Sequence, residues 1–188
     1  MPSDPVRLVV LTGTCAVGKS TFAARLQGRI GGQVFHMDDY ISAPPPPGYP
    51  PEWFRRRVGY LPEIGRKLAA ALEAFPITTF EGVLLGSEEV PTLARSAGLS
   101  YPSRSVFVII LERSLEECWV RKSRERGFRE QYPWIDSAAK FQQAFYDGYR
   151  PTGVDADMVL KGARIDDGIG LEQLLKRLRA RGLVSAQV

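Results

Sequence analysis

The sequence predicts an α/β protein in which a parallel five-stranded sheet lies between two layers of helices. Three observations lead to this prediction. Short apolar runs alternate along the chain with segments in which apolar residues recur at helical spacing. Strands that alternate with helices form parallel sheets with right-handed crossovers. A glycine-rich motif joins the first apolar run to the first helical segment. With 188 residues, the chain is long enough for one domain with a substantial core, so we expect a single domain over residues 1–188.

The expected elements follow one another in order along the chain. Strands are expected at 6–11, 33–37, 77–80, 105–111 and 157–160. Helices are expected at about 19–29, 62–74, 90–97, 115–126, 136–149 and 171–181. Ser114 can cap the fourth helix, and Glu117 completes a capping box three residues later. Residues 128–134 are expected to form a loop, and so are residues 43–51, because their prolines suit neither a helix nor a central strand.

The glycine-rich motif is GTCAVGKS, which fits the phosphate-binding pattern G-x-x-x-x-G-K-[ST] of the P-loop. Lys19 would bind the β- and γ-phosphates of a nucleotide, and the Ser20 hydroxyl would ligate Mg²⁺. The motif between a strand and a helix predicts the three-layer P-loop NTPase fold. No N-[KT]-x-D pattern for guanine is visible, which favours ATP. The residues expected to bind ATP are Gly13, Thr14, Cys15, Ala16, Val17, Gly18, Lys19, Ser20 and Thr21.

Two carboxylates are expected at the same edge of the sheet as the P-loop. Asp38 follows the second strand and Glu81 ends the third, and the carboxyl ends of parallel strands form one ligand-binding edge. A carboxylate near a γ-phosphate is useful for holding Mg²⁺ or for accepting the proton of an attacking hydroxyl. Asp38 is the candidate base, whereas Asp39 should point to the other side of an extended strand end. His36 is expected to be a packed or surface residue rather than a catalyst.

Two further segments could close over this edge. Arg121 and Arg124 lie three residues apart on one predicted helix, at the start of a candidate lid over about 121–135. They could stabilise the charge that develops during phosphoryl transfer, or they could belong to a solvated basic face. The proline-rich segment, at about 40–62, is a candidate substrate flap in which Trp53 could stack on a substrate, or it is a linker.

Taken together, these pieces resemble the uridine kinase and nicotinamide riboside kinase group of P-loop kinases. The resemblance rests on the P-loop, on DDY at 38–40, on EG at 81–82 and on the start of the lid. It implies that Asp38 is the general base toward the acceptor hydroxyl and that Glu81 organises the metal and the substrate. Members of the group usually hold the ribose hydroxyls with an Asp of the flap, where this chain has Tyr49. Phosphorylation of a hydroxyl is therefore better supported than a nucleoside acceptor.

The composition narrows the possible partners. The formal charge of +4 suits an anionic ligand, and no motif of a nucleic-acid-binding module is present. Cys15 and Cys118 lie outside any C-x-x-C or metal spacing, so we expect free thiols and a cytoplasmic location. No apolar run is long enough to span a membrane. The expected partners are ATP, Mg²⁺ and a small-molecule acceptor.

The sequence therefore favours a small-molecule kinase that transfers the γ-phosphoryl group of ATP to an alcohol. Two alternatives remain open. In a nucleoside monophosphate kinase the arginines would hold an acceptor phosphate, and Asp38 would be unexpected because that acceptor needs no strong base. The third possibility is a regulatory nucleotide-binding protein without small-molecule turnover.

Overall fold

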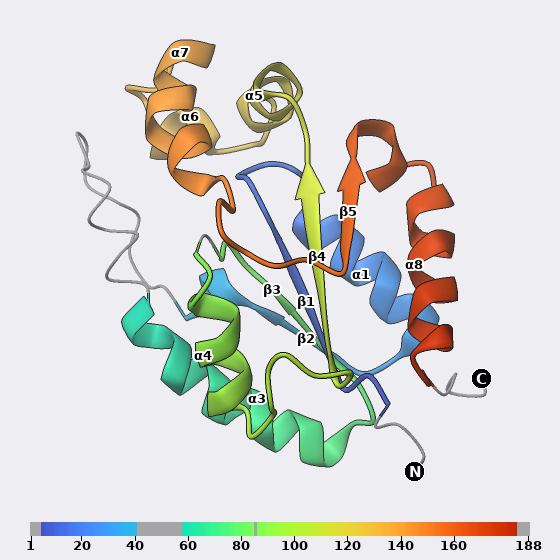
Figure 1. The fold of residues 1–188 in the computed structure, drawn as a ribbon. Coiled ribbons are helices and arrows are strands. Elements are labelled where there is room, and N and C mark those ends of the chain that lie inside the picture. Colours follow the sequence, from blue (N-terminus) through green and yellow to red (C-terminus); the bar gives the residue numbers. More distant parts are fainter. Residues whose placement is uncertain (1–4, 41–57, 85, 184–188) are drawn as a thin grey trace.

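A computed structural model describes residues 5–40, 58–84 and 86–183, and its centre is a five-stranded parallel sheet (Figure 1). The strands are β1 (Leu8–Gly13), β2 (Gln33–His36), β3 (Thr78–Glu81), β4 (Val106–Glu112) and β5 (Met158–Lys161). Their order in the sheet is β2-β3-β1-β4-β5. The predicted parallel sheet is thus confirmed. Because β1 lies between β3 and β4, the carboxyl end of β1 is at the point where the strand order reverses, where ligands of such sheets bind.

Helices cover both faces of the sheet, as the three-layer prediction requires. One face carries α1 (Lys19–Ile30) and α8 (Ile169–Ala180), and the other carries α3 (Leu61–Ala74) and α4 (Glu89–Ser96) (Figure 1). Alternate residues of a strand point to opposite faces, and all of β1 is buried. None of the helices in the described part of the chain is both long and apolar enough to cross a membrane.

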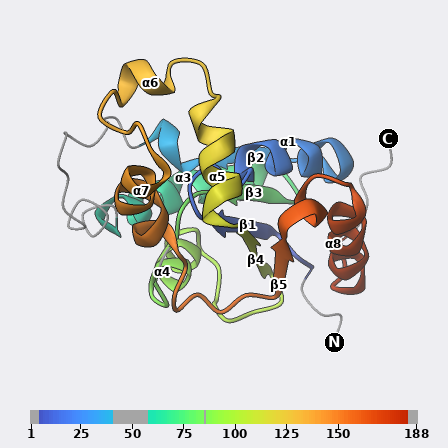
Figure 2. The ribbon, with the colours of Figure 1, turned by 90° about the horizontal axis from the view of Figure 1, so that it is seen from above.

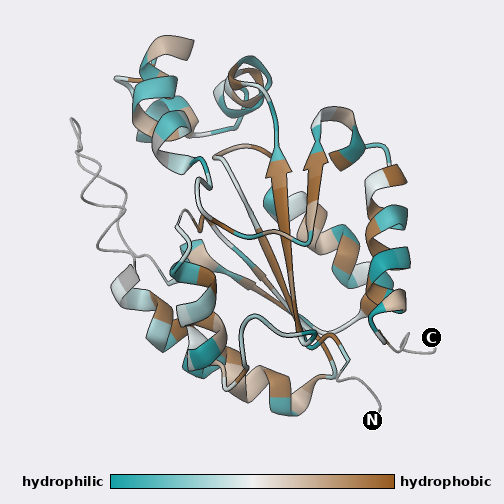
Figure 3. Ribbon diagram, in the orientation of Figure 1, coloured by the Kyte–Doolittle hydropathy of each residue, from teal (hydrophilic) through white to brown (hydrophobic). Residues whose placement is uncertain are grey.

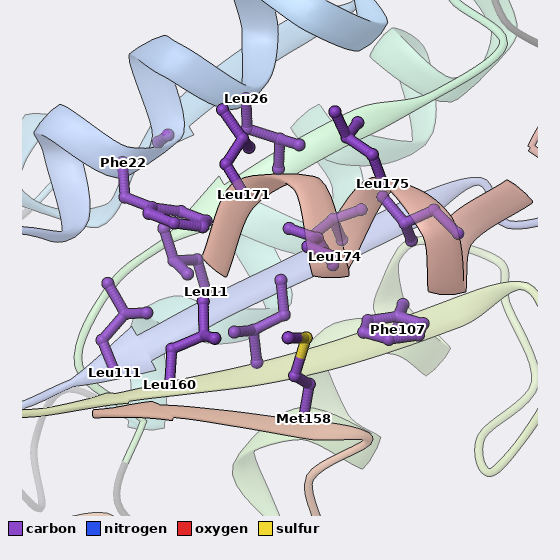
Figure 4. Close-up of a cluster of buried hydrophobic side chains, with 14 of the residues drawn as sticks. Leu11, Phe22, Leu26, Phe107, Leu111, Met158, Leu160, Leu171, Leu174 and Leu175 are labelled. Atoms are coloured by element: carbon purple, nitrogen blue, oxygen red, sulfur yellow. The ribbon is translucent and has the colours of Figure 1, made fainter. Parts of the chain in front are cut away.

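The two layers are held to the sheet by separate apolar cores. In the first core, Phe22 of α1 and Leu174 of α8 meet Leu11 of β1 and Leu160 of β5 (Figure 4). In the second, Leu8 of β1 belongs to the cluster formed with α3 and α4. Strand β4 is hydrophobic along nearly its whole length, whereas the helices carry hydrophilic residues as well (Figure 3). Burial on both faces explains why β1 and β4 read as apolar runs.

Three further helices lie beyond the carboxyl ends of β4 and β5, as Figures 1 and 2 show. They are α5 (Leu115–Ser123), α6 (Phe128–Gln131) and α7 (Ala138–Phe141). A third cluster, which is rich in aromatic side chains and includes Cys118 of α5, joins them. The predicted capping box is confirmed, because the Glu117 N–H donates to Ser114 Oγ (3.2 Å) and the Ser114 N–H donates to Glu117 Oε2 (3.1 Å).

Two expected elements differ from the structure. The expected loop at 128–134 begins with α6, because Phe128 is buried against Trp119 at 6.4 Å between ring centroids. The helix expected over 136–149 is not uniform. It continues from α7 into a π-helical segment, Gln142–Tyr146, and a 3₁₀ turn, Asp147–Tyr149. The wider π turns shift the register of the helix, a feature that is frequent at functional sites.

Candidate active site

The P-loop connects the end of β1 to the start of α1 through backbone conformations that favour glycine. Gly13 and Gly18 have φ angles of 151° and 106°. A Cβ atom on Gly13 would lie 2.3 Å from the carbonyl oxygen of Leu111, so no other residue fits without displacing β4. Lys19 folds back across the loop, and its Nζ donates to the carbonyl oxygens of Gly13 (3.3 Å) and Thr14 (3.0 Å).

This geometry forms a cradle for an anion. Lys19, Ser20 and Thr21 open α1, so their N–H groups belong to the first helical turn, which has no partners within the helix. The positive end of the helix dipole faces the same place. Residues 13–21 are thus the part of the described chain that could hold the phosphates of a nucleotide.

Ser20, Glu81 and His36 form a hydrogen-bonded cluster beside this cradle. The Ser20 hydroxyl donates to Glu81 Oε1 over 2.9 Å, and His36 Nδ1 lies 2.7 Å from the same oxygen. Only 6% of the Glu81 side chain is exposed, and a buried carboxylate is stable only with such partners. Because a carboxylate accepts but does not donate, His36 Nδ1 carries the proton. The structure thus brings together Ser20 and Glu81, the two residues predicted to bind the metal. It also places His36, which was expected to be a packed or surface residue, in contact with Glu81.

Strand register explains why His36 reaches Glu81. In the pairing of β2 with β3, His36 lies opposite Glu81, the last residue of each strand. Gly82 allows the two strand ends to approach, because a Cβ atom there would lie 2.7 Å from the Cβ atom of Met37. The segment after Gly82 is held to β1, because the Thr12 hydroxyl donates to the Leu84 carbonyl (3.0 Å) and accepts from the Leu84 N–H (2.9 Å).

Asp38 lies close to the P-loop but does not lie on an extended strand end. Met37–Asp39 form a 3₁₀ turn, in which successive side chains differ in direction by about 120°. The expectation that strand alternation separates Asp38 from Asp39 is therefore wrong, and both residues are exposed. Burial raises the pKa of the Cys15 thiol, and the negative charge of Asp38 adds to this rise. The carboxylate is thus within electrostatic range of the phosphate-binding loop.

The two candidate lid arginines occupy different surroundings. Arg121 Nη1 pairs with Asp166 Oδ2 at 3.3 Å, and its Nη2 would lie 3.3 Å from a Cβ atom on Gly18. Arg121 therefore lies against the P-loop. Arg124 caps the carboxyl end of α5, is exposed, and forms no ion pair with any described residue. The helix α5 ends at Ser123, and the Arg124 N–H donates to the Arg121 carbonyl in its last turn (3.3 Å), so the expectation that the two arginines share one face stays a prediction.

Arg113 is a site residue that the sequence reasoning missed. It follows the last residue of β4, and only 4% of its side chain is exposed. Its Nε donates to the Val17 carbonyl (2.9 Å), its Nη2 pairs with Asp166 (2.5 Å), and its own carbonyl accepts from the Tyr146 hydroxyl (2.9 Å). The available signal was an arginine two positions after the continuous apolar run 106–111, at the edge where the P-loop lies.

Lys122 and Tyr132 approach the P-loop from the expected lid. Burial by itself would lower the pKa of the Lys122 ammonium, but Cys15 and Glu125 raise the pKa above its usual value. Burial also raises the pKa of the Tyr132 hydroxyl. Lys122 opposes that rise, while Cys15 and Asp38 add to it. Both side chains are therefore within electrostatic range of Cys15 in the P-loop. Neither residue was predicted from the sequence.

The remaining predictions concern the residues that would bind a metal ion and the substrate. No cluster of three His, Cys, Asp or Glu side chains suited to a metal ion occurs in the described ranges. Mg²⁺ does not need one, because it commonly binds one or two carboxylates together with substrate phosphates and water. Ser20 and Glu81 fit that oxygen chemistry. Tyr49 and Trp53, with most of the expected flap, lie outside the residues that the structure describes.

Comparison with known proteins identifies the fold. No protein-family model matches the chain, and no curated protein matches it. A sugar kinase from Janibacter sp. HTCC2649 is similar over 98% of this chain and 100% of its own, with 18% identity and a TM-score of 0.65. The APS kinase of Mycobacterium tuberculosis, solved with AMPPNP and APS, is similar over 96% and 99%, with 18% identity and a TM-score of 0.61.

A third solved structure, a gluconokinase from Sinorhizobium meliloti 1021, is similar over 96% of this chain and 99% of its own, with 18% identity and a TM-score of 0.57. The architecture of this chain is therefore the three-layer P-loop NTPase fold, in the form that these kinases share. At this level of identity the likeness defines the fold and leaves the acceptor open.

Proposed function

We propose that this protein is an ATP-dependent kinase that transfers the γ-phosphoryl group to a hydroxyl of a small molecule. The observation that carries the proposal is the hydrogen bond between Ser20 and Glu81. This hydrogen bond joins the start of α1 to the end of β3. It places the Ser20 hydroxyl and the Glu81 carboxylate, two oxygen ligands of the kind that Mg²⁺ prefers, at the edge where Lys19 crosses the loop. Asp38, the carboxylate within range of Cys15 in the same loop, suits an acceptor that must lose a proton.

In this proposal residues 13–21 bind the phosphates of ATP, and Lys19 moves its ammonium from the loop carbonyls to the β- and γ-phosphates. Ser20 and Glu81 would hold Mg²⁺, which offsets phosphate charge when it is bound. Arg121, which lies against Gly18, adds positive charge beside the transferring group. Arg124 has the same proposed role without a supporting contact in this structure.

Asp38 is the proposed general base. The attacking hydroxyl forms a bond to the γ-phosphorus while the bond to the β–γ bridging oxygen breaks, and the hydroxyl proton passes to the Asp38 carboxylate. The products are a phosphate monoester and ADP. The exposed position of Asp38 beside the P-loop leaves room for an acceptor to approach it.

Two acceptor classes are supported by different observations. The resemblance of the site motifs to uridine and nicotinamide riboside kinases favours a nucleoside-like alcohol. The structural neighbours named as a sugar kinase and a gluconokinase favour a sugar or sugar acid instead. We propose a nucleoside-like acceptor first, with a weaker need for the ribose cis-diol because Tyr49 replaces the usual aspartate.

A panel of acceptors tests the proposal. Nucleosides, sugars, sugar acids and nucleoside monophosphates are offered with ATP and Mg²⁺, and ADP release is measured. Lys19→Ala is the control, and we expect it to lose on the order of 10²-fold or more in rate. Stimulation by nucleoside monophosphates alone would indicate a nucleoside monophosphate kinase. Slow hydrolysis that no acceptor stimulates would overturn the proposal in favour of a regulatory protein.

A further inference from the structure

We propose that His36 is a positioning residue that holds the Glu81 carboxylate for the metal–nucleotide complex. The inference rests on the proposed function, because it assigns a partner to a carboxylate proposed to hold Mg²⁺. It begins from the convergence of two donors on one oxygen. The Ser20 hydroxyl and His36 Nδ1 reach Glu81 Oε1 at 2.9 Å and 2.7 Å.

The two donors are not equivalent. The Ser20 hydroxyl has a single proton, and its oxygen is the proposed metal ligand, so its direction depends on whether the metal is bound. The His36 N–H comes from the neighbouring strand and has no such second role. It can therefore hold Glu81 in the same orientation with or without the metal. Partners of metal-binding carboxylates typically act in this way, and their loss costs about 10- to 100-fold in metal affinity.

Burial also argues against packing as the only role of His36. Its side chain is 37% exposed, whereas only 6% of the Glu81 side chain is exposed. The half-exposed imidazole removes little apolar surface from water. Its polar partner, however, is the buried Glu81 carboxylate, which would accept one hydrogen bond fewer without His36. The β2–β3 register, which pairs the two residues, makes the contact a product of the sheet itself.

Four variants test the inference: His36→Ala, His36→Asn, His36→Gln and, as a matched control on the same strand, Gln33→Ala. The asparagine amide nitrogen occupies nearly the position of Nδ1, whereas the glutamine nitrogen lies one bond further out. Mn²⁺ binding to the protein with a non-hydrolysable ATP analogue is followed by electron paramagnetic resonance, which needs no acceptor. We expect His36→Ala and His36→Gln to weaken Mn²⁺ binding by about 10- to 100-fold, and His36→Asn to restore most of it.

Substitution of the exposed control residue Gln33 should leave Mn²⁺ binding unchanged, and circular dichroism should show that all variants are folded at the temperature of the binding measurement. Equal Mn²⁺ affinity for wild type and His36→Ala would overturn the inference, and so would equal loss for the asparagine and glutamine variants. Failure of the proposed function is separate. If no acceptor stimulates ADP release but the Mn²⁺ series follows the expected order, the positioning role stands and the kinase assignment falls.

Discussion

Arg113 links the P-loop to Asp166, because its Nε donates to the carbonyl oxygen of Val17 over 2.9 Å and its Nη2 pairs with the Asp166 carboxylate. The guanidinium is almost fully buried, and its planar group of N–H donors can bond to two acceptors at once. The Tyr146 hydroxyl donates to the carbonyl of the same residue, so the π-helical segment is connected to the P-loop through Arg113.

The first prediction follows from this contact. Arg113→Lys keeps the charge but cannot serve both acceptors, so a buried carbonyl loses its donor. We expect the free energy of unfolding to fall by about 1–3 kcal/mol and the affinity for ATP to weaken. Urea denaturation and calorimetric ATP titration measure the two effects. Arg126→Lys, an exposed exchange of the same kind, should stay within about 0.5 kcal/mol of wild type. Wild-type stability in Arg113→Lys would show that the contact is dispensable.

The second prediction concerns the proposed base. Asp38→Asn keeps the shape and removes the proton acceptor, so we expect kcat to fall by about 10²- to 10⁴-fold, with ATP affinity little changed. Asp39→Asn should have a much smaller effect, because the resemblance assigns the base role to the first aspartate of the pair, Asp38. Steady-state kinetics with the best acceptor and ATP titration measure both. Reversed effects would make Asp39 the base.

The third prediction separates the two lid arginines. Arg121→Ala should lower kcat more than it weakens ATP binding, because its proposed partner is charge that peaks in the transition state. Arg124→Ala should change kcat less, because Arg124 is exposed and Arg121 lies against Gly18. Comparing kcat with KM for ATP in each variant provides the measurement. If both substitutions alter only stability, the arginines belong to a solvated basic face.

The fourth prediction uses the raised pKa of the Cys15 thiol, and the main cause of this rise is the partial burial of the thiol. The thiolate is the reactive form, so at neutral pH Cys15 should react with iodoacetamide more slowly than in the urea-unfolded chain. The rate should rise as the pH increases beyond the ordinary thiol range. Because the fold favours the neutral thiol, its contribution to stability is present below the unfolded pKa and is lost as the pH rises through the folded pKa.

The same experiment tests the nucleotide site. ATP should slow the labelling of Cys15 further, since residue 15 lies in the phosphate-binding loop. Mass spectrometry distinguishes Cys15 from the buried Cys118, and Cys15→Ala is the control. Labelling of Cys15 that is fast at neutral pH and indifferent to ATP would contradict both the burial effect and the placement of ATP.

Features set by local pattern and by the general geometry of parallel sheets could be predicted from the sequence. The Ser114 capping box involves residues three apart, and the P-loop conformation depends on its own glycines, so both could be predicted. The alternation of apolar runs and helical segments predicted the parallel sheet, because covering both faces of a strand requires that pattern. The proximity of Ser20 to Glu81 followed from placing their elements at one edge.

Which further residues reach that edge became clear from the tertiary structure. His36 reaches Glu81 because β2 and β3 pair in one register, and Gly82 leaves room for Met37 beside the two strand ends. Arg113 reaches the P-loop only because β4 lies beside β1. Strand order and register arise from packing between residues far apart in the chain, and local propensity and spacing carry no information about such contacts.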